Sequence, residues 1–323
     1  MDPIEFLAED DGDAIDVSVI DPEILYNEGL LLIERGENKK ALKRFSLVVI
    51  RFPESKFHIP SIFNIAVSHK NMNEYEKAKE YYELFIEKSD SLKDKRRGKL
   101  AISEVLMETH DLEGAQKILD ETGKEELSLL EEIEHKARLG RLKIRQKKLA
   151  EAAAVLKEAL ALSEQNWDNP LMEGNYFVSM ALFDAAEIYS ILFASIKFLL
   201  PVERMEKDLL DKFNLFMKAQ NGYIKVIRTP NLFWSQAAGY RIGSLYEKLY
   251  KDLLEAEIPP DLTEEERVIY FEELNKFIKP LLKKALAIYE NNIASAKNSG
   301  IKYDWIRKSE EQLNRLKKML DEQ

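Results

Sequence analysis

The chain has 323 residues, of which 45% are apolar and 33% are charged, and it contains no cysteine. This composition is typical of a soluble, well-packed protein, and it excludes disulfides and thiolate chemistry. Only 12 Gly and 10 Pro occur. They are too few for the many turns of a β-barrel or sandwich, so the composition favours long helices.

The net charge of −10 is concentrated at the N-terminus. Residues 1–23 contain nine Asp or Glu and no Lys or Arg, which leaves 49 acids against 48 bases in the rest of the chain. We therefore expect an acidic N-terminal arm over residues 1–21 and a nearly neutral body. Nucleic acid is not an expected partner, because its binding requires a concentrated basic surface.

The segment 176–200 is the most apolar part of the chain. Asp184 and Glu187 lie near its centre, and each would cost about 2.5–3.5 kcal/mol in the middle of a bilayer. The sequence therefore predicts a helix buried in protein and no membrane span.

Small residues recur at a spacing of 37, each with another small residue twelve positions before it and a large apolar residue four positions after it. The three sets are Ala41, Ala78, Ala115 and Ala152; Gly29, Ala66, Ser103 and Gly140; and Phe45, Tyr82, Leu119 and Leu156. Small residues let two antiparallel helices approach closely, and the large residue fills the space beside them. The sequence predicts four helical hairpins over 22–165, with turns at 34–38, 70–74 and 109–111. Because one hairpin cannot bury its outer face alone, the hairpins should stack into an all-α solenoid.

The first two hairpins resemble the tetratricopeptide repeat family. The first has Tyr26, Gly29, Ala41 and Phe45, followed by the Phe52-Pro53 junction, in that family's order of small, aromatic and proline positions. The third and fourth hairpins keep the small residues but lack the proline, so they are divergent copies. The resemblance implies a right-handed superhelix.

The strict period ends after Gln165, and residues 166–323 are expected to form a divergent region of longer tetratricopeptide-like helices with a C-terminal capping helix. Apolar residues at three- and four-residue spacing predict the helices of this region. Their expected ranges are 172–198, 202–227, 233–255, 263–297 and 303–320. Thr263 and Glu266 form an expected capping box at the start of the fourth of these helices.

Two further resemblances suggest a location. The 37-residue period and the junction 52–55 resemble repeats of bacterial envelope proteins, such as the barrel-assembly lipoprotein and the Tol-Pal accessory protein. Residues 234–319 resemble the C-terminal part of deltaproteobacterial envelope repeat proteins, including gliding-motility components. These resemblances imply a periplasmic envelope scaffold. The acidic opening Met1-Asp2-Pro3 is not a signal peptide, so either an exported protein has lost its leader or the protein is cytoplasmic.

No catalytic, cofactor or metal site is expected, and we do not expect an enzyme. The four histidines, His58, His69, His110 and His135, have no second His or Cys at ligand spacing. His69 is expected to be packed and hydrogen-bonded instead. No phosphate-binding Gly loop or nucleophile motif occurs in the sequence.

The resemblance also implies a concave partner-binding groove lined by the first helix of each hairpin. With Gly29, Ala66 and Gly140 as the small residues of these helices, the expected groove residues are Tyr26, Leu30, Ile33, Phe63, Val67, Arg138, Arg141 and Arg145. Either the apolar members bind a partner or they pack against one another. The arginines either form a solvated face or receive an acidic segment, for which the arm 1–21 is a candidate.

Two functions fit these observations. The first is a non-enzymatic scaffold that binds other subunits of a bacterial cell-envelope assembly, with a role in motility as one form of it. The alternative is a cytoplasmic regulatory protein whose repeats bind a peptide or small ligand. The sequence leaves the partner and the oligomeric state undefined.

Overall fold

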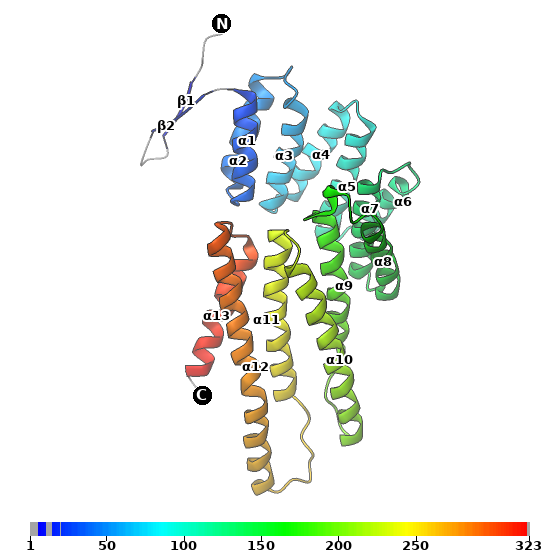
Figure 1. The fold of residues 1–323 in the computed structure, drawn as a ribbon, viewed down its shortest axis with the longest axis vertical. Helices are drawn as coiled ribbons and strands as arrows, with labels where there is room; N and C mark the ends of the chain where they lie inside the picture. The colour runs from blue at the N-terminus through cyan, green and yellow to red at the C-terminus, as the bar shows by residue number, and fades with distance from the viewer. Residues whose placement is uncertain (1–5, 11–14, 20, 322–323) are drawn as a thin grey trace. The chain divides into compact units, whose positions relative to one another are not determined.

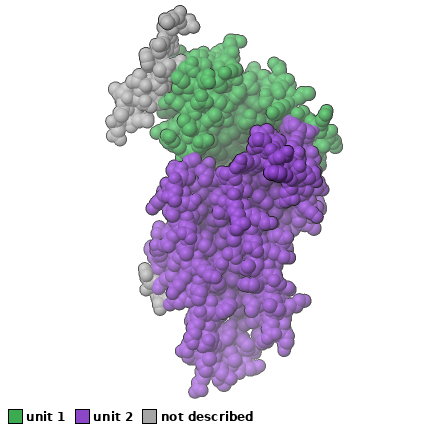
Figure 2. All heavy atoms as spheres, viewed as in Figure 1, with its two compact units in different colours: residues 1–126 green, residues 127–323 purple. Residues whose placement is uncertain are grey.

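The structure is a computed structural model, and it describes residues 6–10, 15–19 and 21–321 (Figure 1). The chain divides into two compact units, residues 1–126 and 127–323 (Figure 2). This division follows contacts in space, whereas the expected boundaries after residues 21 and 165 follow the regularity of the sequence. Those two boundaries stay predictions.

Unit 1 begins with an antiparallel strand pair and continues with three helical hairpins. The strands are β1 (Phe6–Asp10) and β2 (Ile15–Val19), in a register that places Phe6 opposite Val19. The helices are α1 (Pro22–Glu34), α2 (Asn38–Arg51), α3 (His58–Asn71), α4 (Tyr75–Lys88), α5 (Leu92–Glu108) and α6 (Leu112–Thr122). All three predicted turns are confirmed. The predicted binding of the arm to a groove or a partner involves side chains of residues 1–20, which the structure does not describe. It stays a prediction.

Unit 2 contains one further hairpin and a layer of longer helices. Its elements are α7 (Leu129–Arg145), α8 (Leu149–Gln165), the 3-10 turn η1 (Pro170–Met172), α9 (Tyr176–Ser195), α10 (Val202–Ile227), α11 (Leu232–Leu254), α12 (Glu264–Ser299) and α13 (Asp304–Asp321). The expected helices are confirmed to within four residues at each end. The capping box is confirmed as well, because Thr263 Oγ1 accepts from the Glu266 backbone N–H at 3.3 Å.

The recurring small residues lie where the hairpins are closest. Ala41, Ala78, Ala115 and Ala152 have no exposed surface, and the aromatic or leucine residue four positions after each is equally buried. A Cβ added to Gly29 would come within 2.6 Å of the Phe45 ring, and one added to Gly140 within 2.5 Å of Leu156. The prediction of an all-α fold built from stacked helical hairpins is confirmed.

The same contact recurs in the longest hairpin, where Gly243 of α11 faces Tyr289 of α12. We expect Gly243→Ala to destabilise the protein by about 1–3 kcal/mol, because the new methyl would lie 2.4 Å from the Tyr289 ring in a filled core. An unobstructed Gly→Ala change within a helix is instead stabilising by about 0.5–1 kcal/mol. Urea unfolding distinguishes the two cases by the sign of the change, and increased stability would contradict this contact.

Helix α9 is the one helix among the described residues that has the length and apolar composition to cross a membrane, and 44% of its most apolar window is buried inside the protein. Asp184 and Glu187 both lie on this helix and form ion pairs with arginines of other helices. These ion pairs indicate that α9 packs against other helices of the protein.

Candidate partner-binding site

The predicted groove residues of unit 1 lie on α1 and α3. The Tyr26 ring packs against Phe45 and Phe57 with centroid distances of 5.7 and 5.1 Å. Its hydroxyl accepts a hydrogen bond from Asn64 Nδ2 at 3.2 Å, which joins α1 to α3. Leu30 is the most accessible of the group, with 37% of its surface exposed, while Ile33 and Val67 are half-buried.

Phe63 belongs mainly to the core of unit 1. It is only 8% exposed, and its ring lies 5.2 Å from Tyr82 and 5.0 Å from Phe85. The Arg97 guanidinium covers the ring at 3.8 Å. Phe63 therefore offers a partner little surface as it stands. The use of Tyr26, Leu30, Ile33, Phe63 and Val67 for binding stays a prediction.

The three arginines of the predicted groove lie on α7, where Arg138 and Arg141 contact other residues of the chain and Arg145 is exposed. Arg138 pairs with Glu134 at 2.9 Å and lies over the Phe177 ring. Arg141 donates two hydrogen bonds to Asp184, at 2.9 and 2.8 Å, and lies over Trp234. Burial raises the pKa of Asp184, and the charge of Arg141 opposes the rise more strongly than the charge of Arg145 does. The acidic residue that pairs with Arg141 therefore belongs to α9 of the same chain. The use of Arg138, Arg141 and Arg145 to bind a partner protein stays a prediction.

Arginine–carboxylate pairs join alternate helices of unit 2. Arg141 of α7 binds Asp184 of α9, Arg241 of α11 binds Glu187 of α9, and Arg315 of α13 binds Glu247 of α11. Arg141 and Arg241 bind their carboxylates in a bidentate manner, which fixes both distance and orientation. Arg315 contacts Glu247 through Nη2, and its side chain is 52% exposed. The three pairs link α7 to α9, α9 to α11 and α11 to α13.

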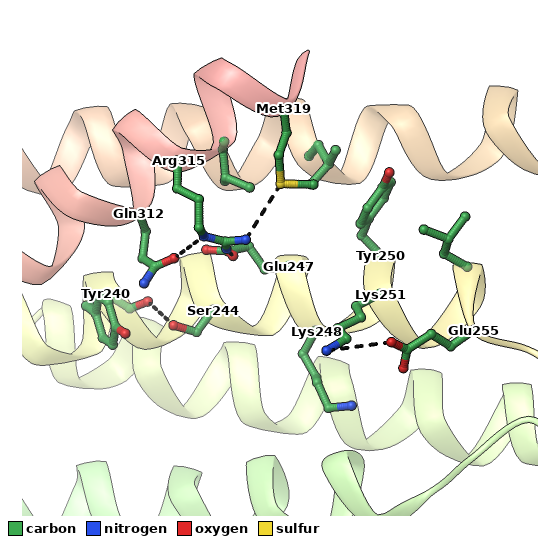
Figure 3. A pocket seen from close by; sticks show the side chains of 13 residues that line it. Tyr240, Ser244, Glu247, Lys248, Tyr250, Lys251, Glu255, Gln312, Arg315 and Met319 are labelled. Atoms are coloured by element: carbon green, nitrogen blue, oxygen red, sulfur yellow. Dashed lines mark hydrogen bonds and ion pairs between the residues drawn. The ribbon is translucent and has the colours of Figure 1, made fainter. Parts of the chain in front are cut away.

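A pocket of about 510 Å³ opens between α11, α12 and α13, beside the last of these pairs (Figure 3). Its lining residues are Tyr240, Ser244, Glu247, Lys248, Tyr250, Lys251, Leu254, Glu255, Leu282, Gln312, Arg315, Leu316 and Met319. Its apolar side consists of Tyr250, Leu254, Leu282, Leu316 and Met319. The other side carries charges of both signs, so the pocket can hold an apolar side chain while polar groups bind the adjoining backbone.

The charged side of the pocket is fixed by hydrogen bonds. The Tyr289 hydroxyl donates to Glu247 at 2.5 Å and lies 3.3 Å from Ser244 Oγ. Burial raises the pKa of Glu247, although its bonds to Tyr289 and Arg315 oppose the rise. Burial also raises the pKa of Tyr289, and the Glu247 carboxylate raises it further. Lys251 lies at the rim, 3.6 Å from Glu255, with both side chains largely exposed.

The pocket residues were not among the predicted site residues, yet the sequence contains a pattern that indicates them. Gly243 takes the place in α11 that Gly29 and Gly140 take in α1 and α7, next to the large residue of the second helix. Counting from Gly243 as Leu30 and Ile33 are counted from Gly29 gives Ser244 and Glu247. Both line the pocket. The part contributed by α13 has no such pattern.

Residues 59–87 match the family model described as tetratricopeptide repeat. This segment of the chain is similar to a tetratricopeptide repeat. It spans α3 and α4, the second of the four predicted hairpins, so the resemblance is supported at that position. The specific relatives in the envelope and in gliding motility are not supported by any match. A comparison with curated protein sequences finds no match.

Solved structures of repeat proteins resemble the chain at low identity. Nearly identical TPR-like repeats from Podosopora anserina match with 12% identity and a TM-score of 0.40, over 62% of this chain and 96% of theirs. A tetratricopeptide repeat protein from Parabacteroides merdae matches with 11% identity and a TM-score of 0.37, over 89% of this chain and 98% of that one. A TPR repeats protein from Bacteroides fragilis matches with 15% identity and a TM-score of 0.29, over 92% and 99% of the two chains.

Tetratricopeptide repeat proteins generally mediate protein–protein interaction.

Among the described residues, no group of three or more His, Asp or Glu is placed to hold a metal ion. His69 is buried, and its Nδ1 lies 2.7 Å from Glu74 Oε2, which confirms that it is packed and hydrogen-bonded.

Proposed function

We propose that the chain is a scaffold that holds a segment of a partner protein in the pocket between α11 and α13. The pocket itself carries this proposal. Its volume lies in the range of known ligand sites, and it joins an apolar side to charged groups already fixed by hydrogen bonds. A fixed site loses less entropy on binding, so a short segment can bind with useful affinity.

The proposal includes a place in a bacterial envelope assembly, with motility as one form of it. The junction Phe52-Pro53-Glu54-Ser55 and the stretch 234–319 support this location by their resemblance to envelope repeat proteins. Fractionation of the native organism with antibodies against the chain tests it. Recovery with periplasmic markers is expected, whereas recovery with cytoplasmic markers would favour the regulatory alternative.

Photo-crosslinking tests the pocket directly. A p-benzoylphenylalanine residue replaces Lys251 at the pocket rim, and the same residue replaces Lys88 at the end of α4 as the matched exposed control. We expect a discrete partner to crosslink from position 251 and not from position 88. Equal crosslinking from both positions would contradict binding in the pocket.

The purified partner then allows a quantitative test. Leu254→Glu places a charge at the apolar rim of the pocket and should weaken partner binding at least tenfold in calorimetry. The control Leu92→Glu changes an exposed leucine of unit 1 and should alter the affinity less than twofold. An unchanged Kd for Leu254→Glu would remove the pocket from the binding surface.

A further inference from the structure

Helix α10 has an apolar side that stays exposed in the part of unit 2 that the structure describes. We define the α10 apolar face as Val202, Leu209, Leu210, Phe213 and Met217, all of which are exposed. Val202, Leu209, Phe213 and Met217 follow one another at spacings of seven, four and four residues, so they lie on one side of the helix, with Leu210 beside them. Phe213 is 52% exposed and Leu210 67%.

The packing of the core of unit 2 does not account for these exposed apolar side chains. The adjoining side of α10 packs against the unit through Lys212, Phe216, Ala219 and Tyr223, all of which are buried. Phe216 contacts Tyr246 of α11 at 4.9 Å, and Phe213 stacks on Phe216 at 6.4 Å. The exposed face therefore adjoins a filled core, as an interaction surface does.

The same end of unit 2 carries more exposed apolar residues. The loops before α10 and after α11 are bonded to each other, because the Leu200 N–H donates to Glu257 Oε2 at 2.7 Å and the Glu257 N–H donates to the Phe198 carbonyl at 3.1 Å. The start of α12 extends beyond the end of α11 (Figure 1), and Phe277 within it is 65% exposed.

The charge at this end is strongly negative. Residues 202–213 and 255–277 contain twelve Asp or Glu but five Lys or Arg, one of which, Lys212, is fully buried. A partner that covers the face must therefore bring apolar side chains flanked by positive charge. Anionic lipid and the acidic arm of the chain would both be repelled. A second copy would place acids against acids.

We propose that the α10 apolar face docks an amphipathic helix of a partner protein whose polar side is rich in Lys and Arg. Helices dock through apolar anchors three, four and seven residues apart, and the spacing of Leu209, Phe213 and Met217 complements such a row. The face shares no residue with the pocket lined by Tyr240 and Met319, so each proposal can fail without the other.

The test uses two synthetic helical peptides of 18 residues with the same leucine face. One carries Lys at its polar positions and the other carries Glu. We expect the Lys peptide to bind the full chain in fluorescence anisotropy at 0.1 M salt, at least tenfold more tightly than the Glu peptide. The double variant Leu209→Ser/Phe213→Ser should weaken the Lys peptide at least tenfold. Ile50→Ser changes an exposed residue of α2 and should alter the affinity of the Lys peptide less than twofold.

A charge-reversal variant keeps the test valid if the Leu209→Ser/Phe213→Ser variant folds poorly. Glu203→Lys/Glu206→Lys changes two exposed residues of α10 and should weaken the Lys peptide while strengthening the Glu peptide. Equal affinity of both peptides, or a Lys peptide that binds all variants alike, would overturn the proposal. Loss of self-association in sedimentation by the apolar variant would show that a second copy covers the face. Loss of binding to phosphatidylglycerol vesicles by the same variant would show that lipid covers the face. Either result overturns the proposal.

Discussion

Replacement of Lys212 by Met is expected to lower the free energy of unfolding by about 3–5 kcal/mol, which is the loss that follows when one partner of a buried ion pair is removed. The Lys212 side chain has no exposed surface and forms an ion pair with Asp252 at 2.7 Å. Its ammonium also donates to the carbonyls of Phe193 and Ile196, at 2.9 and 2.6 Å.

The cost is large because three groups lose a partner at once. The carbonyls of Phe193 and Ile196 lie where α9 ends, and a helix end leaves carbonyls that require a donor. The ammonium also complements the negative end of the helix dipole. Burial lowers the pKa of Lys212, and the hydrogen bond and charge of Asp252 oppose that effect. Methionine fills a similar volume but supplies neither the donors nor the charge.

Urea unfolding followed by tryptophan fluorescence measures this loss, since Trp234 is buried in unit 2. The matched control is Lys207→Met, an exposed lysine of the same helix, which should change stability by less than about 0.5 kcal/mol. If the two variants lose equal stability, Lys212 does not stabilise the end of α9.

The hairpins could be predicted from the sequence because their packing repeats. Ala41 and Ala152 are 111 residues apart, yet both are fully buried at the same place in a hairpin. A constraint that recurs at constant spacing is visible without knowing which helices touch. The start of α12 was predicted for a related reason, since the Thr263–Glu266 capping box is entirely local.

The strand pair of the arm could also have been predicted. Ile15, Val17 and Val19 alternate with Asp16 and Ser18, which is the period of a strand. The nine acids of residues 1–23 predict only a charged arm and no secondary structure. The alternation fixes the strand but not a partner for the arm.

The polar contacts of unit 2 could not be predicted, because they join residues far apart in the sequence. Arg141 and Asp184 are separated by 43 positions, and nothing local identifies one as the partner of the other. Lys212 lies among Asp and Glu residues of α10 and resembles an ordinary solvated lysine in the sequence. Only the packing of α9 and α11 around it shows that it is buried.

The pocket falls between these two cases. Ser244 and Glu247 follow from the position of Gly243, which is a local pattern. Arg315 and Met319 belong to α13, and their place beside α11 depends on how the last helix packs. The Arg315–Glu247 pair joins the two helices across 68 positions of the chain.

The second large effect is expected at Glu187, whose carboxylate joins three helices. It accepts hydrogen bonds from the Tyr223 hydroxyl of α10 and from Nε and Nη2 of Arg241 of α11, with the Nε contact at 2.5 Å. Burial alone would lower the pKa of Arg241, and the Glu187 carboxylate raises it above its ordinary value. Glu187→Ala should therefore cost about 3–5 kcal/mol, because it leaves a shielded guanidinium and a buried hydroxyl without their acceptor.

A double-variant cycle separates the ion pair from simple loss of packing. Glu187→Leu and Arg241→Leu should each be strongly destabilising, whereas the double variant should lose less than the sum of the two, with a coupling of about 1–3 kcal/mol. Glu164→Ala, an exposed glutamate at the end of α8, is the control and should lie within about 0.5 kcal/mol of the parent. If the two single losses simply add, the carboxylate and the guanidinium stabilise their helices independently. The links between α7, α9, α11 and α13 would then be a result of packing and not its cause.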